Sequence, residues 1–185
     1  RMSLDHPQKV THAAILDIIP QHHLLNHVSR QWGTFSWHWF FNIQPYDLPE
    51  RMMGADPDWF IEKKLAKTKQ GLSFFDPAAL AEYKRCFRNP ETIHAVCEDY
   101  RATFGIDLEM DTKDFEAGRK IECPVLLLWG VTGGVGRNHK PGPAEIWRNY
   151  ATNIIGAKAL PCGHYLSEEA PKETTEALRA FFIAA

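Results

Sequence analysis

The hydrophobic residues of the chain form short unbroken runs near both ends and follow helical spacing in the middle. The first run, residues 10–19, is mostly apolar and is bounded by Pro7 and Pro20. A second run covers residues 123–130. Short apolar runs between turn residues are typical of strands buried on both faces of a sheet. The pattern therefore predicts two core strands, separated by about a hundred residues of different character.

The last third of the chain alternates between the two patterns. A Gly-rich loop at 131–142 is followed by a helical stretch at 143–151, a short strand at 157–162 and a helical pattern at 171–184. Such alternation predicts an α/β fold with a parallel sheet and right-handed crossovers. In open sheets of this kind, ligands bind beyond the carboxyl ends of the strands. Asp17 and His164 both lie at such ends.

The middle of the chain lacks strand signals and predicts an all-helical insertion. Its expected helices, most of which begin at Asp-Pro or Asn-Pro, cover residues 22–43, 57–68, 77–87 and 90–104. Residues 45–56 are expected to be irregular. The predicted organisation is the end of a core helix and a core strand at 1–19, a helical cap at 20–112 and a C-terminal α/β core at 113–185.

Composition excludes several classes of protein. The 185 residues are 44% hydrophobic and 24% charged, which are ordinary values for a folded globular chain. The net charge of −2 gives no basic surface for nucleic acid or an anionic membrane. No apolar stretch approaches the roughly 20 residues that span a bilayer. The four scattered cysteines favour reduced thiols and a cytoplasmic location, without disulfides.

His164 is the strongest candidate for a general base. It follows the third predicted strand and Gly163, which frees the backbone so that the imidazole can project over the sheet edge. Asp17 lies inside an apolar run, where a carboxylate needs a partner, and orienting a histidine would supply one. The alternatives are structural: His164 could cap the following helix, and Asp17 could cap the turn before Pro20.

An aromatic segment at 35–41 places His38 beside Trp39. Imidazole and indole groups both donate hydrogen bonds, and the phenol of Tyr100 could add a third donor. Donors set in an apolar wall suit a small anion stripped of water. From composition alone, an aromatic core in a helical layer is the favoured reading.

Two further patterns are weaker. His22, His23 and His27 include an i, i+4 pair of the kind that binds zinc, but no carboxylate or cysteine completes the set, so we predict no metal site. The glycines at 130–136 lack the order of a phosphate-binding loop and indicate a flexible surface loop. No Gly-x-Ser-x-Gly or Gly-x-Asp-x-Gly nucleophile elbow occurs in the sequence.

Several motifs in order resemble the C-terminal portion of the haloacetate dehalogenase family of α/β-hydrolases, with fluoroacetate dehalogenases most similar. They are LDIIP at 16–20, WHW at 37–39, GADPD at 54–58, CEDYRA at 97–102, LWG at 128–130 and GHYLSEEAP at 163–171. The resemblance covers essentially the whole chain. It implies the C-terminal part of an α/β-hydrolase parallel sheet with an all-helical cap insertion.

The resemblance also implies a mechanism without a cofactor. In the family, an elbow Asp attacks the carbon that bears the halogen, and a histidine-activated water hydrolyses the resulting ester. By motif match, His164 would activate the water, and Asp17 would orient the imidazole of His164. His38, Trp39 and Tyr100 would hold the leaving halide of a small haloacid. The elbow Asp and the arginines that grip the substrate carboxylate would lie upstream of Arg1, so the chain by itself is expected to be an inactive fragment.

Two other hypotheses remain open at this point. An epoxide hydrolase would keep the fold and use a cap tyrosine as proton donor, for which only Tyr100 is placed suitably. A truncated module with vestigial catalytic residues would expose the edge and faces of its sheet and would therefore dimerise or aggregate.

Overall fold

The computed structural model describes residues 1–66, 71–139 and 141–183. The described residues divide into two compact units, one formed by residues 1–28 and 108–185 and the other by residues 29–107. The first unit contains the sheet and the second is helical. The two ends of the chain therefore form an α/β unit, and the middle of the chain forms a helical unit.

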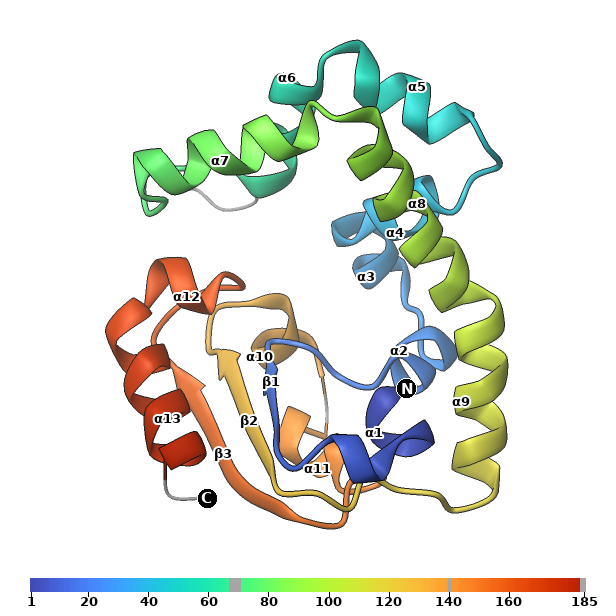
Figure 1. The fold of residues 1–185 in the computed structure, drawn as a ribbon, viewed down its shortest axis with the longest axis vertical. Helices are drawn as coiled ribbons and strands as arrows, with labels where there is room; N and C mark the ends of the chain where they lie inside the picture. Colours follow the sequence, from blue (N-terminus) through green and yellow to red (C-terminus); the bar gives the residue numbers. More distant parts are fainter. Residues whose placement is uncertain (67–70, 140, 184–185) are drawn as a thin grey trace. The chain divides into compact units, whose positions relative to one another are not determined.

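The first unit is built on a parallel sheet in the order β1-β2-β3 (Figure 1). Its strands are β1 (Ala13–Leu16), β2 (Val125–Gly130) and β3 (Ile154–Leu160). Ile15 of β1 pairs with Leu127 of β2, which in turn pairs with Ala157 of β3. The structure confirms the predicted fold class, a parallel α/β sheet, although the outer strands are shorter or shifted relative to the sequence runs.

Alternate residues of β2 supply two separate cores, as a strand buried on both faces requires. Leu126 and Leu128 pack with Phe181 on the side covered by α13 (Pro171–Ile183). Val125 and Leu127 pack with Trp147 of α11 (Pro143–Trp147) on the other side. The remaining helical elements of this unit are α1 (Met2–Asp5), η1 (Pro7–Lys9), α2 (Gln21–Asn26), α9 (Ile106–Glu116, from residue 108), α10 (Gly134–Asn138) and α12 (Leu166–Glu169).

The helical unit has its own core. Met53, Phe87, Ile93 and Cys97 are buried together. Its helices are α3 (Arg30–Phe35), α4 (Trp37–Asn42), α5 (Leu48–Ala55), α6 (Pro57–Leu65), α7 (Pro77–Phe87) and α8 (Pro90–Phe104). Asp56, Asp76 and Asn89 cap the helices that follow them, which explains the Asp-Pro and Asn-Pro starts in the sequence. None of the helices that the structure describes is long and apolar enough to cross a membrane.

Two expectations about the helical unit were wrong. Residues 45–56 are not irregular, because α5 occupies Leu48–Ala55. Pro49 lies in the first turn, where its missing N–H is not needed, and strong helix formers follow it. The single helix expected at 22–43 is broken into α2, α3 and α4. Ser29 interrupts it by accepting a hydrogen bond from the Trp32 amide at 3.1 Å, which starts a new helix.

Three expectations about the sheet unit also change. Strand β1 ends at Leu16 because Asp17 has a φ of 48°, which leaves the extended conformation. Strand β3 begins at Ile154, which pairs with Val125, and it stops before Pro161, which cannot continue a ladder. The loop expected at 130–136 contains α10, whose Val135 is buried.

Gly130 has very little room for a side chain. A Cβ atom there would lie 1.8 Å from the carbonyl oxygen of Gly163 and 2.6 Å from that of Cys162. The backbone of β2 therefore contacts the segment after β3 directly. We predict that Gly130→Ala lowers the free energy of unfolding by at least about 2 kcal/mol, because backbone atoms cannot move aside as a flexible side chain can.

Urea unfolding of the purified chain measures this loss. Gly142→Ala is the matched control, since a Cβ atom at Gly142 meets nothing within 4 Å. Equal stability of the two variants would contradict the close approach at Gly130.

Candidate functional site

Asp17 and His164 form a direct pair at the carboxyl ends of their strands. Asp17 follows β1 and is 1% exposed, and its Oδ2 lies 2.6 Å from Nδ1 of His164. The half-exposed imidazole follows β3 after a short turn. Because β1 and β3 flank β2 in parallel, their carboxyl ends meet at one edge of the sheet.

The other oxygen of Asp17 is held by the backbone. Oδ1 accepts a hydrogen bond from the Gly130 amide at 2.9 Å, and the Asp17 amide donates to the Leu128 carbonyl at 2.8 Å. A Cβ atom at Gly133 would lie 3.1 Å from Oδ2, so the glycines of this segment leave room for the carboxylate. Both oxygens of the buried carboxylate are therefore satisfied, as burial of a charged group requires.

The geometry selects one tautomer of His164. A carboxylate accepts hydrogen bonds, so Nδ1 carries the proton and donates it to Asp17. Nε2 is then the ring nitrogen with a lone pair to accept a proton. A histidine held in this way can act as a general base on a water or a hydroxyl group.

The segment after β2 is tied to the segment after β3. The hydroxyl and the amide of Thr132 both donate to the Cys162 carbonyl, at 2.9 and 3.1 Å. The Val131 amide donates to the Leu160 carbonyl at 3.0 Å. The backbone that carries His164 is thus fixed to the same loop that binds Asp17.

The helical unit brings His38, Trp39 and Tyr100 together. The Tyr100 ring lies 5.3 Å from the Trp39 ring and 5.9 Å from the His38 ring, in edge-on arrangements. His38 is 3% exposed and the other two are half-buried. The edge-on ring packing is also what an aromatic core would show. Beyond ring packing, the cluster places an imidazole, an indole and a phenol, each able to donate a hydrogen bond, in one apolar region.

Burial raises the pKa of Tyr100 to about 12, and the neighbouring Asp99 adds to the shift. The phenol therefore keeps its proton at neutral pH and can only donate toward an anion.

The histidines at the start of the insertion do not converge on a metal. His22 Nδ1 lies 2.8 Å from the Tyr150 hydroxyl, while the rings of His23 and His27 stack at 4.2 Å. His27 Nδ1 lies 2.7 Å from the His23 carbonyl. These contacts give each ring a structural partner.

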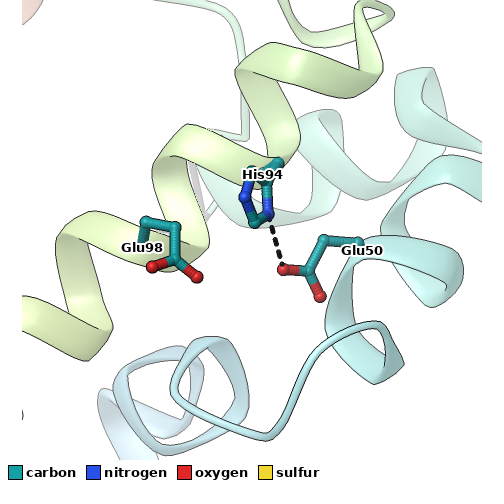
Figure 2. A group of neighbouring side chains, drawn as sticks. All are labelled: Glu50, His94 and Glu98. Carbon is teal, nitrogen blue, oxygen red and sulfur yellow. Dashed lines mark hydrogen bonds and ion pairs between the residues drawn. The ribbon is translucent and has the colours of Figure 1, made fainter.

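A mixed group of ligand types does occur on the helical unit. Glu50 of α5 faces His94 and Glu98 of α8, and His94 Nδ1 lies 3.2 Å from a Glu50 oxygen (Figure 2). Arg101 already binds this group, with Nη1 at 2.7 Å from Glu50 and 2.6 Å from Glu98. A cation would have to displace the guanidinium, so the arrangement is an ion-pair network rather than a prepared metal site.

Arg101 ties three segments of the helical unit together. Its Nη2 also donates to the Gln44 carbonyl at 2.6 Å, just after α4. The sequence showed no sign of this network, because its members lie far apart along the chain. Arg101 directly follows Tyr100, so the same turn of α8 carries one member of the aromatic cluster and the centre of the ion-pair network.

No family model matches the chain. A fluoroacetate dehalogenase from Burkholderia sp. is 39% identical over 183 residues, which cover 98% of this chain and 58% of that protein. A soluble epoxide hydrolase from Corynebacterium sp. (strain C12) is 26% identical over 147 residues, or 78% of this chain and 48% of that protein.

Solved structures give the same fold. A candidate α/β hydrolase from Nostoc sp. PCC 7120 has a TM-score of 0.92 and 46% identity, covering all of this chain and 62% of that one. A candidate epoxide hydrolase from Pseudomonas aeruginosa has a TM-score of 0.89 and 40% identity, covering 99% of this chain and 60% of that one. The chain thus has the α/β-hydrolase fold and spans less than two thirds of these relatives.

The ion-pair network predicts how acid affects stability. Burial alone would raise the pKa of Glu50, but hydrogen bonds from Arg101, the backbone and His94 outweigh it and lower the pKa to about 2 from its usual 4.5. The stabilisation by this depressed carboxyl is complete above pH 4.5 and is lost as the pH falls toward 2. We predict that urea unfolding shows stability falling over this range in the natural chain and falling less in Glu50→Gln.

At neutral pH, Glu50→Gln should lower the free energy of unfolding by about 2 kcal/mol, since it removes a charged acceptor from a mostly buried guanidinium. Glu98→Gln is the matched control, because Glu98 pairs with the same arginine but is 54% exposed, and we expect a loss below about 1 kcal/mol. Equal losses in the two variants would contradict the central role of Glu50.

Proposed function

Because this chain has the α/β-hydrolase fold and is a homologue of a fluoroacetate dehalogenase, we propose that it forms the cap and C-terminal core of a hydrolase that removes halide from a small haloacetate. The observation that carries this proposal is the Asp17–His164 pair, which has the geometry of a base and its orienting acid. The 39% identity to the Burkholderia protein supports the choice of substrate class.

The proposed reaction has two steps. First, a carboxylate nucleophile attacks the carbon that bears the halogen, so that a C–O bond forms, the carbon–halogen bond breaks and the halide leaves. Then Nε2 of His164 takes a proton from water, whose oxygen attacks the carbonyl carbon of the ester. The ester C–O bond breaks, the leaving oxygen takes the proton held by His164 to give a 2-hydroxy acid, and the carboxyl group loses its proton to solvent, which restores the carboxylate. Asp17 stabilises the imidazolium that forms in this step.

His38, Trp39 and Tyr100 are proposed to bind the departing halide. Fluoride concentrates its charge on one small atom, so it leaves poorly unless donors stabilise that charge as it develops. The raised pKa of Tyr100 supports this role, because the phenol stays protonated. We propose no cofactor and no metal for this reaction.

The nucleophile is proposed to lie outside these 185 residues. The sequence contains no elbow motif, and the chain covers 58% of the Burkholderia relative. We use "full-length protein" below for this chain together with an upstream segment that carries the elbow. Fluoride release by the full-length protein, measured with an ion-selective electrode, tests the proposal. Release by the full-length protein but not by the 185-residue chain is the expected result.

An epoxide is the second candidate substrate. It is favoured by the Corynebacterium epoxide hydrolase, which is 26% identical to this chain. In that chemistry a phenol donates a proton to the opening epoxide oxygen, and Tyr100 would be the donor. Turnover of a styrene-oxide-like substrate by the full-length protein, without halide release from fluoroacetate, would favour this candidate and contradict dehalogenation.

The halide role of the aromatic cluster gives a specific prediction. Trp39→Phe removes the indole N–H and keeps an aromatic ring, so it should lower the rate of fluoride release by about 100-fold and that of chloride release much less. The difference arises because fluoride needs more stabilisation as a leaving group.

Rates with fluoroacetate and chloroacetate are to be compared in the full-length protein. Trp59→Phe is the control, since Trp59 is exposed on α6 and lies outside the cluster. An equal loss for both halides in Trp39→Phe would refute halide binding by Trp39 and would indicate a packing role.

A further inference from the structure

The turn that carries His164 is bound on both sides by one carboxylate. Glu169 Oε2 accepts a hydrogen bond from the Gly163 amide at 2.7 Å, and Oε1 accepts one from the Tyr165 amide at 3.0 Å. These are the two backbone N–H groups that flank His164 in the sequence. Hydrogen bonds to a charged acceptor are about twice as strong as neutral ones.

Gly163 fits this arrangement closely. A Cβ atom there would lie 2.8 Å from both carboxylate oxygens of Glu169. The carboxylate therefore packs directly against the backbone of the turn, in space that any side chain at position 163 would fill. The Glu169 amide in turn donates to the Tyr165 carbonyl at 2.8 Å, so the segment 163–169 is closed by hydrogen bonds in both directions.

The His164 ring has little other support. Its side chain is 48% exposed, and within the described part of the chain it contacts Asp17 at 2.6 Å and the neighbouring Tyr165 ring at 5.1 Å. A half-exposed ring on a short turn gains rotational freedom if its backbone moves. The 2.6 Å contact with Asp17 thus depends on how rigidly the backbone at 163–165 is held.

From these contacts we infer that Glu169 is a positioning residue for His164. It acts through the backbone on both sides of the histidine, and it keeps Nδ1 on Asp17 and Nε2 available. That Glu169 assists catalysis rests on the proposed function, whereas its effect on the position of His164 does not. The sequence contained the residue in its GHYLSEEAP motif but gave no reason to separate Glu169 from Glu168.

The test uses NMR of the ¹⁵N-labelled 185-residue chain with two variants. Glu169→Gln keeps the volume but offers one acceptor oxygen instead of two, and Glu169→Ala offers none. We expect the His164 Nδ1–H proton to exchange with solvent about tenfold faster in Glu169→Ala than in the natural chain, with Glu169→Gln between them. The Gly163 and Tyr165 amide signals should shift in the same order.

Glu176→Gln is the control, because Glu176 is exposed on α13 and should leave these signals unchanged. Altered Gly163 and Tyr165 amides with unchanged His164 exchange would overturn the inference, since Glu169 would then hold the backbone only. Unchanged amides would overturn it as well. Should Glu169→Ala fail to fold, the comparison of Glu169→Gln with Glu176→Gln decides between these outcomes.

The full-length protein separates this inference from the proposed function. If both hold, Glu169→Gln slows ester hydrolysis, while the first release of fluoride keeps its rate. If the natural full-length protein releases no halide from any haloacetate, the proposed function fails. The NMR result then still decides whether Glu169 positions His164.

Discussion

The carboxylate of Asp17 is almost completely removed from water, and the rest of the sheet unit is arranged around that fact. A buried carboxylate without partners costs several kcal/mol. Here one oxygen receives the Gly130 amide and the other receives His164. The carboxyl ends of all three strands therefore lie close together, since Asp17 follows β1, Gly130 ends β2 and His164 follows β3.

The close approach of these strand ends explains why glycines are concentrated there. Backbone segments must approach within van der Waals contact so that an amide, rather than a side chain, can reach the carboxylate. A Cβ atom at Gly130 would overlap the backbone after β3, one at Gly163 would press on the Glu169 carboxylate at 2.8 Å, and one at Gly133 would lie only 3.1 Å from Asp17. A glycine cluster that the sequence suggested was a flexible surface loop in fact contacts the segment after β3 and the side chain of Asp17.

The sequence predicts features that depend on neighbouring residues and misses features that depend on contacts between distant segments. The apolar runs and their turn residues were enough to predict three strands, and the position of Asp17 and His164 at strand ends was enough to expect their pairing. The start of β3 is set by pairing with β2, and the end of β1 is set by the positive φ of Asp17, so neither limit follows from the apolar runs. The helix at Leu48–Ala55 lies in a stretch expected to be irregular, and its Pro49 is in the first turn, where proline is favoured. Arg101 and Glu169 act through contacts that no periodicity reveals.

We propose that His164, held by Asp17, activates the water that hydrolyses a covalent ester. The most direct test is the intact mass of full-length His164→Gln after incubation with fluoroacetate. We predict that one carboxymethyl group accumulates on the protein and that about one fluoride is released per molecule, because the ester forms but is not hydrolysed. Continued turnover without a covalent adduct would contradict it.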